Sequence, residues 1–427
     1  MARRKRAVEE VVGQKAKAMT STCRHCGSAL EASFCNLGMS PLANSLVEQQ
    51  HSSAAEKHYP LELFVCSSCL LVQLDEFETP DAIFGNYSYF SSFSDTWVAH
   101  AKRYVEKVCD EYKFDQRSQV VEIASNDGYL LKEFVRRNIP ALGVEPAVNV
   151  AKVAQEAGVP TINKFFGRSL ARELVEQGLS ADLVIANNVL AHVPDLSDFV
   201  SGFKILLKPT GVLTIEFPHL LRLMEGVQFD TVYHEHFSYF SFFAAEKLMA
   251  SHGLQIFDVE KLETHGGSLR LYVTHQERSV SQGAAIRLLR EEELRAGLLS
   301  IDGYRKFPER VRGVRRKLLR FLLDAEENGK LVVGYGAPAK AVTLLSYCGV
   351  GPDLLKFTVD RSPHKQGRLL PGSRLPIYAP DRIREAKPDY ILIFPWNIKD
   401  EIIDQLSFAR SWGAKFIVPI PEVAIIP

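Results

Sequence analysis

The sequence predicts an α/β protein with a small N-terminal metal-binding domain, a central parallel sheet covered by helices, and a smaller C-terminal α/β domain. Three observations predict this arrangement. Paired cysteines lie near the N-terminus, short apolar runs alternate with helical patterns from about residue 100, and the alternation restarts after residue 328. At 427 residues the chain is long enough for several such units.

The composition argues against several classes of partner. Lysine plus arginine and aspartate plus glutamate each total 51, so the formal net charge is zero and gives no general affinity for nucleic acid. No apolar run approaches the ~20 residues that span a bilayer. The basic segment 1–19 lacks an apolar stretch, so we expect a mobile tail and not a secretory signal, with an arm for nucleic acid or an anionic surface as the alternative. We therefore expect a cytoplasmic protein without nucleic-acid or membrane partners.

Two Cys-x-x-Cys pairs occur in the expected N-terminal domain, residues 20–78. In a reducing cytosol such pairs are more often metal ligands than disulfides, and four thiolates close a tetrahedral zinc site with no open position. The 39 residues between the pairs exceed the usual spacing, so a folded segment must fill the gap. The expected ligands of this structural Zn²⁺ are Cys23, Cys26, Cys66 and Cys69.

The central domain is expected at residues 79–277. Its lead-in at 79–99 is rich in aromatic residues and serines and is expected to be irregular. QVVEIAS, ALGVEP, ADLVIANNVL and GVLTIEFP then predict buried strands separated by helices. LQIFDVEKL and SLRLYVTHQ flank a tight turn at 264–267 and predict a hairpin at the sheet edge. A doubly wound, Rossmann-like sheet that ends in an antiparallel hairpin is typical of class I methyltransferases.

Residues 278–328 are charged and strongly helical and predict a connector, followed by a Rossmann-like domain at 329–427. That domain begins with a G-x-G-x-x-A pattern, formed by Gly334 and Gly336 after an apolar strand, and Asp360 ends the next strand. Lys340 adds a positive charge at the start of the following helix. The pattern suits NAD, and it equally suits the pyrophosphate of another nucleotide.

The carboxyl ends of three expected strands of the central sheet carry polar residues. The first ends in a loop that opens a helix and presents free backbone N–H groups. The second ends in an acidic residue that can accept hydrogen bonds from ribose hydroxyls, and the third ends in two asparagines. This order and spacing resemble S-adenosylmethionine binding. The expected cofactor-binding residues are Glu122, Ala124, Ser125, Asn126, Asp127, Gly128, Glu145, Pro146, Asn187 and Asn188.

A cluster of titratable side chains follows the fourth strand. In an extended segment, Tyr233 and Glu235 would point to one side and His234 and His236 to the other. His192 follows the third strand, so it is expected near the same crevice. A loop with histidines satisfied by backbone hydrogen bonds is the structural alternative, and a metal site is a weaker one, because adjacent residues rarely point at one ion.

The chain resembles the bacterial nucleotide-sugar 3-C-methyltransferases, which make branched deoxysugars. The resemblance lies in the Cys-x-x-Cys pairs, the Ser-Asn-Asp-Gly loop, the GYGAPAK segment and, most specifically, YHEHFSYFS. It covers nearly the whole chain from about residue 20. It implies an S-adenosylmethionine-dependent enzyme that methylates carbon 3 of a nucleotide-linked 4-keto-6-deoxy sugar, with the C-terminal domain helping to hold that sugar nucleotide.

The same resemblance implies roles for individual residues. His236 is expected to be the base that removes the proton from carbon 3, with Glu235 orienting or polarising it. Tyr233 and His192 are expected to hydrogen bond the enolate oxygen, and Tyr87 matches a further active-site tyrosine of the family. A sugar O-methyltransferase and an NAD-dependent nucleotide-sugar enzyme are the alternatives. The Asn/Asp-Pro-Pro-Tyr/Phe segment usual in enzymes that methylate base amines is absent after the third strand.

Overall fold

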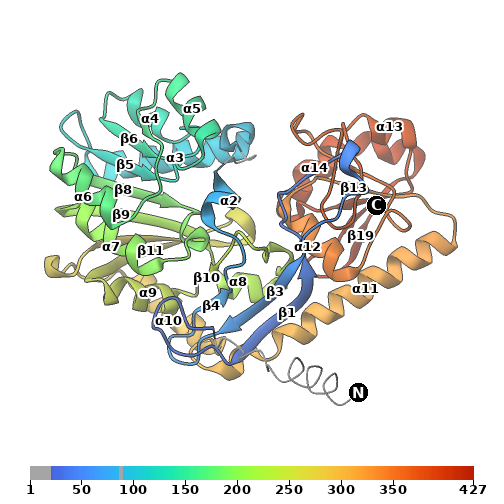
Figure 1. Cartoon of the computed structure of the whole chain (residues 1–427), viewed down its shortest axis with the longest axis horizontal. Coiled ribbons are helices and arrows are strands. Elements are labelled where there is room, and N and C mark those ends of the chain that lie inside the picture. The colour runs from blue at the N-terminus through green and yellow to red at the C-terminus, as the bar shows by residue number, and fades with distance from the viewer. Residues whose placement is uncertain (1–20, 86–89) are drawn as a thin grey trace, which may run out of the picture.

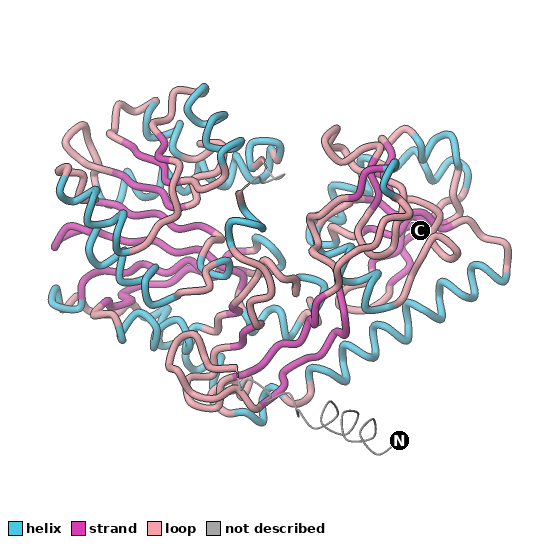
Figure 2. Tube along the Cα trace, in the orientation of Figure 1, coloured by secondary structure: helices cyan, strands magenta, loops and turns pink. Residues whose placement is uncertain are grey.

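The computed structural model describes residues 21–85 and 90–427. The basic tail expected at residues 1–19 and the expected active-site residue Tyr87 lie outside the described residues. The described chain forms two lobes; long strands of the N-terminal part run between them, and the long helix α11 (Phe307–Glu327) lies along one edge of the C-terminal lobe (Figure 1, Figure 2). Within these ranges, no helix is long and apolar enough to cross a membrane.

The N-terminal part folds around an antiparallel sheet that fills the gap between the two cysteine pairs. Its strand order is β1 (Ala32–Ser40), β3 (Tyr59–Val65), β4 (Val72–Leu74) and β10 (Ser238–Tyr239). The last strand comes from the central part of the sequence, so this sheet is completed by another domain. A second link is made by β2 (Val47–Glu48), which pairs with β15 (Arg368–Leu369) of the C-terminal part.

The aromatic lead-in is more regular than the sequence predicts. It contains the short helix α2 (Pro80–Phe84) and a 3-10 turn (Ser91–Phe93), and helix α3 (Asp95–Tyr112) begins before residue 100. The hydroxyls of Thr79 and Ser94 accept hydrogen bonds from the first turns of α2 and α3. These N-caps start the helices before the apolar periodicity becomes visible, which explains the difference.

The central sheet has seven strands, with helices between them along the chain. Its strands run in the order β11 (Leu254–Leu262), β12 (Ser268–His275), β9 (Leu207–Pro218), β8 (Ala181–Asn187), β5 (Val120–Ile123), β6 (Ala141–Val144) and β7 (Thr161–Ile162). All neighbours from β9 to β7 are parallel, whereas β12 is antiparallel to both its neighbours. Pairing of Ser268 with Pro218 places the β11–β12 turn at the edge where the parallel strands end. The helices among these strands are α4 (Leu131–Val135), α5 (Val148–Glu156), α6 (Arg168–Glu176), α7 (Leu196–Leu206), α8 (Leu220–Glu225) and α9 (Phe242–Ser251).

The C-terminal part is a smaller α/β sheet reached through two helices, α10 (Ala284–Arg295) and the long α11 (Phe307–Glu327). Five strands are parallel, and the last is antiparallel to its neighbour. The strand order is β16 (Ile377–Tyr378), β14 (Thr358–Val359), β13 (Val332–Tyr335), β17 (Tyr390–Ile393), β18 (Lys415–Val418) and β19 (Ala424–Ile426). The helices of this part are α12 (Ala339–Cys348), α13 (Arg382–Ala386) and α14 (Lys399–Gln405).

One hydrophobic core joins the parts. It contains buried residues of the N-terminal sheet, of α8, α11 and α12, and of the C-terminal sheet. The rings of Phe34 in β1 and Phe307 in α11 stack with centroids 4.8 Å apart and planes 7° apart. The architecture is the α/β fold that the sequence predicts, with a shared interior between its domains.

Candidate active site and zinc centre

The two cysteine pairs form similar tight turns. The backbone N–H of Gly27 donates to the carbonyl of Cys23 at 2.8 Å, and that of Leu70 donates to the carbonyl of Cys66 at 2.9 Å. Gly27 and Leu70 follow the second cysteine of their pairs and have φ values of 73° and 61°. A positive φ directly after the pair lets the chain turn back, so that both sulfurs point to one side.

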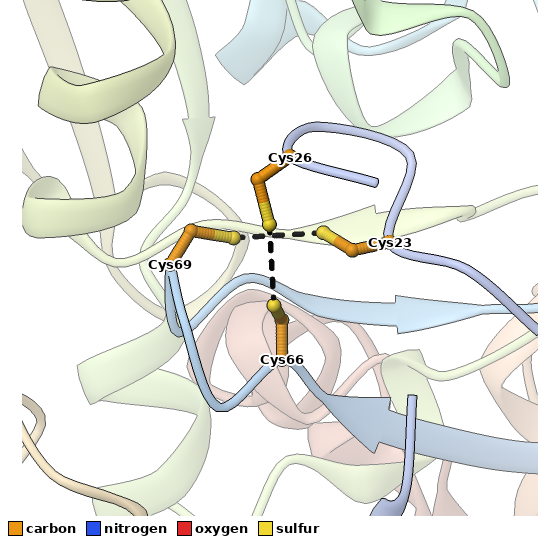
Figure 3. A group of neighbouring side chains, drawn as sticks. All are labelled: Cys23, Cys26, Cys66 and Cys69. Atoms are coloured by element: carbon orange, nitrogen blue, oxygen red, sulfur yellow. Dashed lines mark hydrogen bonds between the residues drawn. The ribbon is translucent and has the colours of Figure 1, made fainter. Parts of the chain in front are cut away.

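The four sulfurs converge on one point (Figure 3). The Sγ atoms of Cys23 and Cys69 are 3.5 Å apart, as are those of Cys26 and Cys66, and all four lie within 4.8 Å of one another. Tetrahedral zinc with Zn–S bonds of about 2.3 Å places its sulfurs about 3.8 Å apart. Gln73 donates to the sulfur of Cys23 at 3.1 Å, as a neighbour of a thiolate ligand does. The cluster therefore holds a structural zinc.

The loop after β5 has a conformation that exposes its backbone. Ala124, Asn126 and Gly128 have φ values of 57°, 50° and 75°, so left-handed residues alternate along it. The carboxylate of Glu145, just beyond β6, accepts from the N–H of Asn126 at 2.9 Å and from that of Ala147 at 2.8 Å. Glu145 thus fixes the loop, and each of its oxygens retains a lone pair for a ligand hydroxyl.

Buried polar atoms without a hydrogen-bond partner among the described residues gather at this edge. An unsatisfied buried polar atom costs about 1–3 kcal/mol, so such a concentration indicates a ligand with matching groups. The expected cofactor residues therefore fit S-adenosylmethionine, which carries ribose hydroxyls, an amino group and a carboxylate. The atoms are Oε2 of Glu122, Oγ of Ser125, Oδ1 of Asp127, Oδ1 of Asn187 and both amide atoms of Asn188.

Burial and mutual repulsion raise the pKa values of acidic groups at this edge. Burial raises the pKa of Glu122 well above its usual value, and the neighbouring Asp127 and Glu145 raise it further. Burial also raises the pKa of Glu145. Pro146, the remaining expected residue, contributes its carbonyl to Asn163, which donates to it at 2.8 Å. A bound cation or hydrogen-bond donor would stabilise this set of acidic groups.

The aromatic lead-in lies over the cofactor loop. The backbone N–H of Ser91 donates to Oδ1 of Asn126 at 2.8 Å, and that of Ser92 donates to Oδ2 of Asp127 at 3.0 Å. The sequence did not predict this contact, because the lead-in and the loop are joined only by tertiary folding.

The histidine cluster forms a turn and not the extended segment expected from its alternation. The N–H of His236 donates to the carbonyl of Tyr233 at 2.9 Å, which closes the turn. His234 consequently points into the N-terminal domain, where its Nε2 donates to the carbonyl of Pro60 at 3.2 Å. The expectation that His234 and His236 share one side is therefore wrong, because a turn breaks the two-residue period of a strand.

His236 lies between the rings of Tyr233 and His192, with ring centroids 4.1 Å and 4.7 Å away. Each imidazole is held by a backbone carbonyl. Nδ1 of His236 donates to the carbonyl of Thr231 at 3.0 Å, and Nδ1 of His192 donates to that of Glu235 at 2.8 Å. Because Nδ1 carries the proton in both rings, both neutral imidazoles present Nε2 as a proton acceptor.

Burial keeps both imidazoles neutral. It lowers the pKa of His236 well below its usual value, with the neighbouring His192 lowering it further. It also lowers the pKa of His192 to about 4. A neutral His192 with Nδ1 bound to a carbonyl has no donor left, so the expected hydrogen bond from His192 to an enolate oxygen does not fit this geometry. His236 remains suited to accept a proton.

Glu235 does not contact the imidazole that it was expected to orient. Its Oε1 accepts from Nδ2 of Asn44 at 2.6 Å, and Oε2 is buried without a partner among the described residues. Burial raises the pKa of this carboxyl to about 7. The turn directs the side chain toward the N-terminal domain, and the carbonyl of Thr231 orients His236 instead.

The structure also brings His265 near His192 and His236. From the sequence, His265 is expected only as part of a hairpin turn. His265 has a φ of 54°, and its ring centroid is 5.1 Å from that of Trp97. Burial lowers its pKa to about 4. A histidine directly before Gly266 and Gly267 in a predicted tight turn is the sequence signal that could have identified it.

Residues of the C-terminal domain itself lie close to the backbone of the G-x-G-x-x-A loop. Gly334 lies in β13, and Gly336 follows it with a φ of 90°, where a Cβ would come within 2.7 Å of Pro395. The carboxylate of Asp360 accepts from the N–H of Ala337 at 2.7 Å. Its other oxygen accepts from a second backbone N–H at 2.8 Å. Asp360 is thus engaged by backbone, which weakens the case for NAD.

The ammonium group of Lys340 contacts the segment that follows β17. Its ammonium group donates to Oδ1 of Asn397 at 2.8 Å and lies 4.4 Å from the ring of Trp396. Asp230 is close enough to raise the pKa of Lys340, although burial lowers it more. The charge therefore faces the junction between the C-terminal and central domains.

Comparisons with known proteins agree with this division of the chain. Family models match a zinc binding domain at residues 23–84, a methyltransferase domain at 97–259 and a C-methyltransferase C-terminal domain at 263–421. The C-methyltransferase NovU of Streptomyces niveus is 36% identical over 407 residues, covering 95% of this chain and 96% of that protein. The match therefore includes all three parts of the chain.

Two further likenesses each cover less than half of the chain. A ubiquinone biosynthesis O-methyltransferase of Bartonella bacilliformis is 25% identical over 139 residues, 31% of this chain and 55% of its own length. The structure of magnesium protoporphyrin IX methyltransferase from Synechocystis is 14% identical and covers 42% of this chain and 83% of its own, with a TM-score of 0.34. The fold assignment depends on the strand order of this chain and not on that likeness.

Proposed function

This chain belongs to the family of S-adenosylmethionine-dependent C-methyltransferases that includes NovU, and from that premise we propose that it methylates carbon 3 of a nucleotide-linked 4-keto-6-deoxy sugar. The observation that carries the proposal is the environment of His236. Its ring is neutral, its Nε2 has no hydrogen-bond partner among the described residues, and it lies against Tyr233 and His192. His192 follows Asn188 closely along the chain, which links the base to the cofactor edge.

The chemistry requires a carbon acid to become a nucleophile. A hydrogen on the carbon beside a ketone is acidic, and its removal leaves an enolate that can attack a methyl group. S-adenosylmethionine, when bound, supplies that methyl group in electrophilic form. Nε2 of His236 takes the proton, while Nδ1–H keeps its hydrogen bond to Thr231 and holds the ring in place. The hydroxyl of Tyr233 is the candidate donor to the enolate oxygen.

The C-terminal domain has a proposed role in binding the substrate, and the cysteine cluster indicates the compartment in which the protein acts. We assign the nucleotide of the substrate to the C-terminal domain, on the resemblance to the sugar C-methyltransferases. The reduced cysteine cluster fits a reducing compartment such as the cytoplasm. Residues Gly334, Gly336 and Lys340 remain proposed substrate contacts, with Lys340 facing the domain junction.

The test separates proton removal from methyl transfer. The enzyme is incubated in deuterated water with nucleotide-linked 4-keto-6-deoxy sugars, and exchange at carbon 3 is followed by NMR while methylation is followed by mass. We expect carbon 3 to exchange and the product to lack hydrogen there. A methylated product that retains the hydrogen of carbon 3 would place the methyl group on an oxygen or on carbon 5, the other carbon beside the ketone, and would contradict the proposal.

Substitution of the base gives the second measurement. His236→Ala is expected to lower kcat by ~10²–10⁴ and to abolish the exchange at carbon 3, because it removes the general base. Tyr233→Phe is expected to cost ~10²–10³ in kcat, because it removes one donor to the oxyanion. His58→Ala, at an exposed histidine, is the control. A His236→Ala enzyme with more than a third of the normal rate would disprove the assignment of the base.

A further inference from the structure

Two side chains of the C-terminal domain hold residues 230–232, one at the side chain of Asp230 and one at the carbonyl of Val232. The indole Nε1 of Trp396 donates to Oδ2 of Asp230 at 2.7 Å. The hydroxyl of Thr343, in α12, donates to the backbone carbonyl of Val232 at 2.6 Å. Asp230 and Thr343 are each only 1% exposed, so water does not compete for these hydrogen bonds.

The residue between these two anchors carries the carbonyl that orients His236. Thr231 ends a short 3-10 helix (Phe229–Thr231), and its carbonyl oxygen accepts from Nδ1 of His236 at 3.0 Å. Its hydroxyl donates to the carbonyl of Gln228 at 2.7 Å, which limits rotation of the segment. The N–H of Val232 donates to the carbonyl of Phe229 at 3.1 Å within the segment, and the anchors at residues 230 and 232 add a constraint on the Thr231 carbonyl from the C-terminal domain.

We infer that Trp396 and Thr343 of the C-terminal domain are positioning residues for His236, acting through the backbone carbonyl of Thr231. The inference rests on the proposed role of His236 as the base. Together the two side chains keep the proton of His236 on Nδ1 and leave Nε2 toward the substrate. Without them, the hydrogen bond from the N–H of Val232 to the carbonyl of Phe229, at 3.1 Å, is left to hold this peptide, so the carbonyl turns more freely and the ring is held less firmly in its tautomer and direction.

The surroundings of Trp396 support a fixed position for its indole. A Cβ on Gly266, in the β11–β12 turn, would come within 2.6 Å of its ring, so the indole lies directly on that turn. The ammonium of Lys340, at the start of α12, lies 4.4 Å from the ring centroid. Trp396 thus contacts the central sheet, the C-terminal helix α12 and the segment before His236.

The consequence is that the domain proposed to hold the nucleotide also sets the geometry of the base. Residues that act on the orientation of the base should change kcat, because misalignment of a reacting group raises the barrier of the chemical step. They should change cofactor affinity little, because the hydrogen bonds of Trp396 and Thr343 go to Asp230 and Val232 and not to the loop after β5.

The test uses two substitutions, each of which removes one hydrogen-bond donor. Thr343→Val removes the hydroxyl at nearly constant volume, and Trp396→Phe removes the indole N–H. We expect each to lower kcat about tenfold, with the Kd for S-adenosylmethionine within twofold of normal. In full-length protein labelled with ¹⁵N-histidine, the signals of His236 should show less protonation at Nδ1. Thr343→Ser keeps the hydroxyl and is expected to restore both the rate and the tautomer.

The matched controls are another threonine and another tryptophan whose side chains also donate a hydrogen bond to a backbone carbonyl. The hydroxyl of Thr274 donates to the carbonyl of Gly211 at 3.1 Å at the far end of the sheet. The indole of Trp412 donates to the carbonyl of Pro388 at 3.1 Å within the C-terminal domain. Thr274→Val and Trp412→Phe are expected to leave kcat and the His236 signals unchanged.

The results for these variants test the positioning role separately from the proposed role of His236 as the base. An unchanged kcat in both test variants, or a lower kcat with an unchanged His236 tautomer, would overturn the positioning role. If Thr343→Val fails to fold, the comparison of Trp396→Phe with Trp412→Phe decides the question by the same two measurements. If His236→Ala remained active, the proposed base would be wrong. The tautomer of His236, measured in the Thr343 and Trp396 variants, would still show whether these two residues hold the ring.

Discussion

Glu235 and His236 are neighbours in the sequence, yet their side chains enter different environments. The imidazole of His236 lies among the rings at the cofactor edge, whereas the carboxyl of Glu235 is buried against Asn44 of the N-terminal domain. Both burials favour the neutral form, but they have opposite consequences, since neutral His236 is the form that can accept a proton. For Glu235, burial creates a cost to stability that depends on pH.

Glu235→Gln is predicted to stabilise the protein in alkaline but not in acidic solution. Burial raises the pKa of Glu235 from 4.5 to about 7. Between these values the folded state holds a proton that the unfolded chain has released, so stability falls as pH rises and the loss is complete above pH 7. Glutamine removes this loss and keeps an acceptor for Asn44. We expect a gain of about 1–3 kcal/mol in the free energy of unfolding at pH 8.

The measurement is denaturant unfolding of both proteins at pH 5 and pH 8. The advantage of Glu235→Gln should be much smaller at pH 5 than at pH 8. Glu111→Gln, at an exposed position, is the control and should change stability by less than about 0.5 kcal/mol at either pH. An equal gain at both pH values would contradict the buried ionisable carboxyl. Activity is measured in parallel, because a catalytic role of Glu235 predicts a stable but slow enzyme.

At the scale of single elements, the cofactor loop depends on the strand beside it. Gly143 in β6 lies under Ser125 of the loop after β5, and a Cβ at this position would come within 2.4 Å of the Ser125 hydroxyl oxygen. The same Cβ would lie 3.1 Å from the hydroxyl of Thr161 in β7. The glycine therefore allows the loop to approach the sheet, and Ser125 is one of the residues with an unpartnered buried hydroxyl.

Gly143→Ala is predicted to weaken cofactor binding. The added methyl group displaces Ser125 and the loop with it, so we expect the Kd for S-adenosylmethionine to rise about tenfold, which is a change of about 1.4 kcal/mol. Isothermal titration calorimetry measures it. Gly313→Ala is the control, since nothing lies within 4 Å of its Cβ position in α11. Alanine there is expected to add about 0.5–1 kcal/mol of stability and to leave the Kd unchanged. An unaltered Kd in Gly143→Ala would show that the loop does not depend on this contact.

At the scale of the molecule, the domains are not independent bodies. The sheet of the N-terminal domain is completed by β10, which directly follows His236, and its core is continuous with α11, α12 and the C-terminal sheet. Domains that share buried surface of this extent unfold together, because exposing one removes the packing of the next. The zinc cysteines Cys23, Cys66 and Cys69 pack instead in the core of the central sheet, so the N-terminal domain contacts both cores.

Removal of zinc is therefore predicted to destabilise the whole chain as one unit. Calorimetry of the intact protein should show a single unfolding transition, and Cys66→Ser should lower its midpoint by on the order of 5 °C or more, because it removes a thiolate ligand. Methyl transfer should fall as well, because β4 and β10 join the zinc domain to the segment that contains the base. Cys109→Ser, at a half-buried cysteine outside the cluster, is the control. A separate low-temperature transition confined to the N-terminal domain would contradict this prediction.

The sequence alone determined the fold class, the zinc ligands and the family, because each depends on local patterns: apolar runs, Cys-x-x-Cys pairs and the segment YHEHFSYFS. It also identified the polar ends of the strands, because parallel strands end at one edge. Only the tertiary structure decided which side chains meet there. A single turn sent His234 and Glu235 toward the N-terminal domain and left His236 to Thr231, and contacts across more than a hundred residues brought Trp396 to Asp230. Such contacts follow from packing between domains, which no spacing within one segment records.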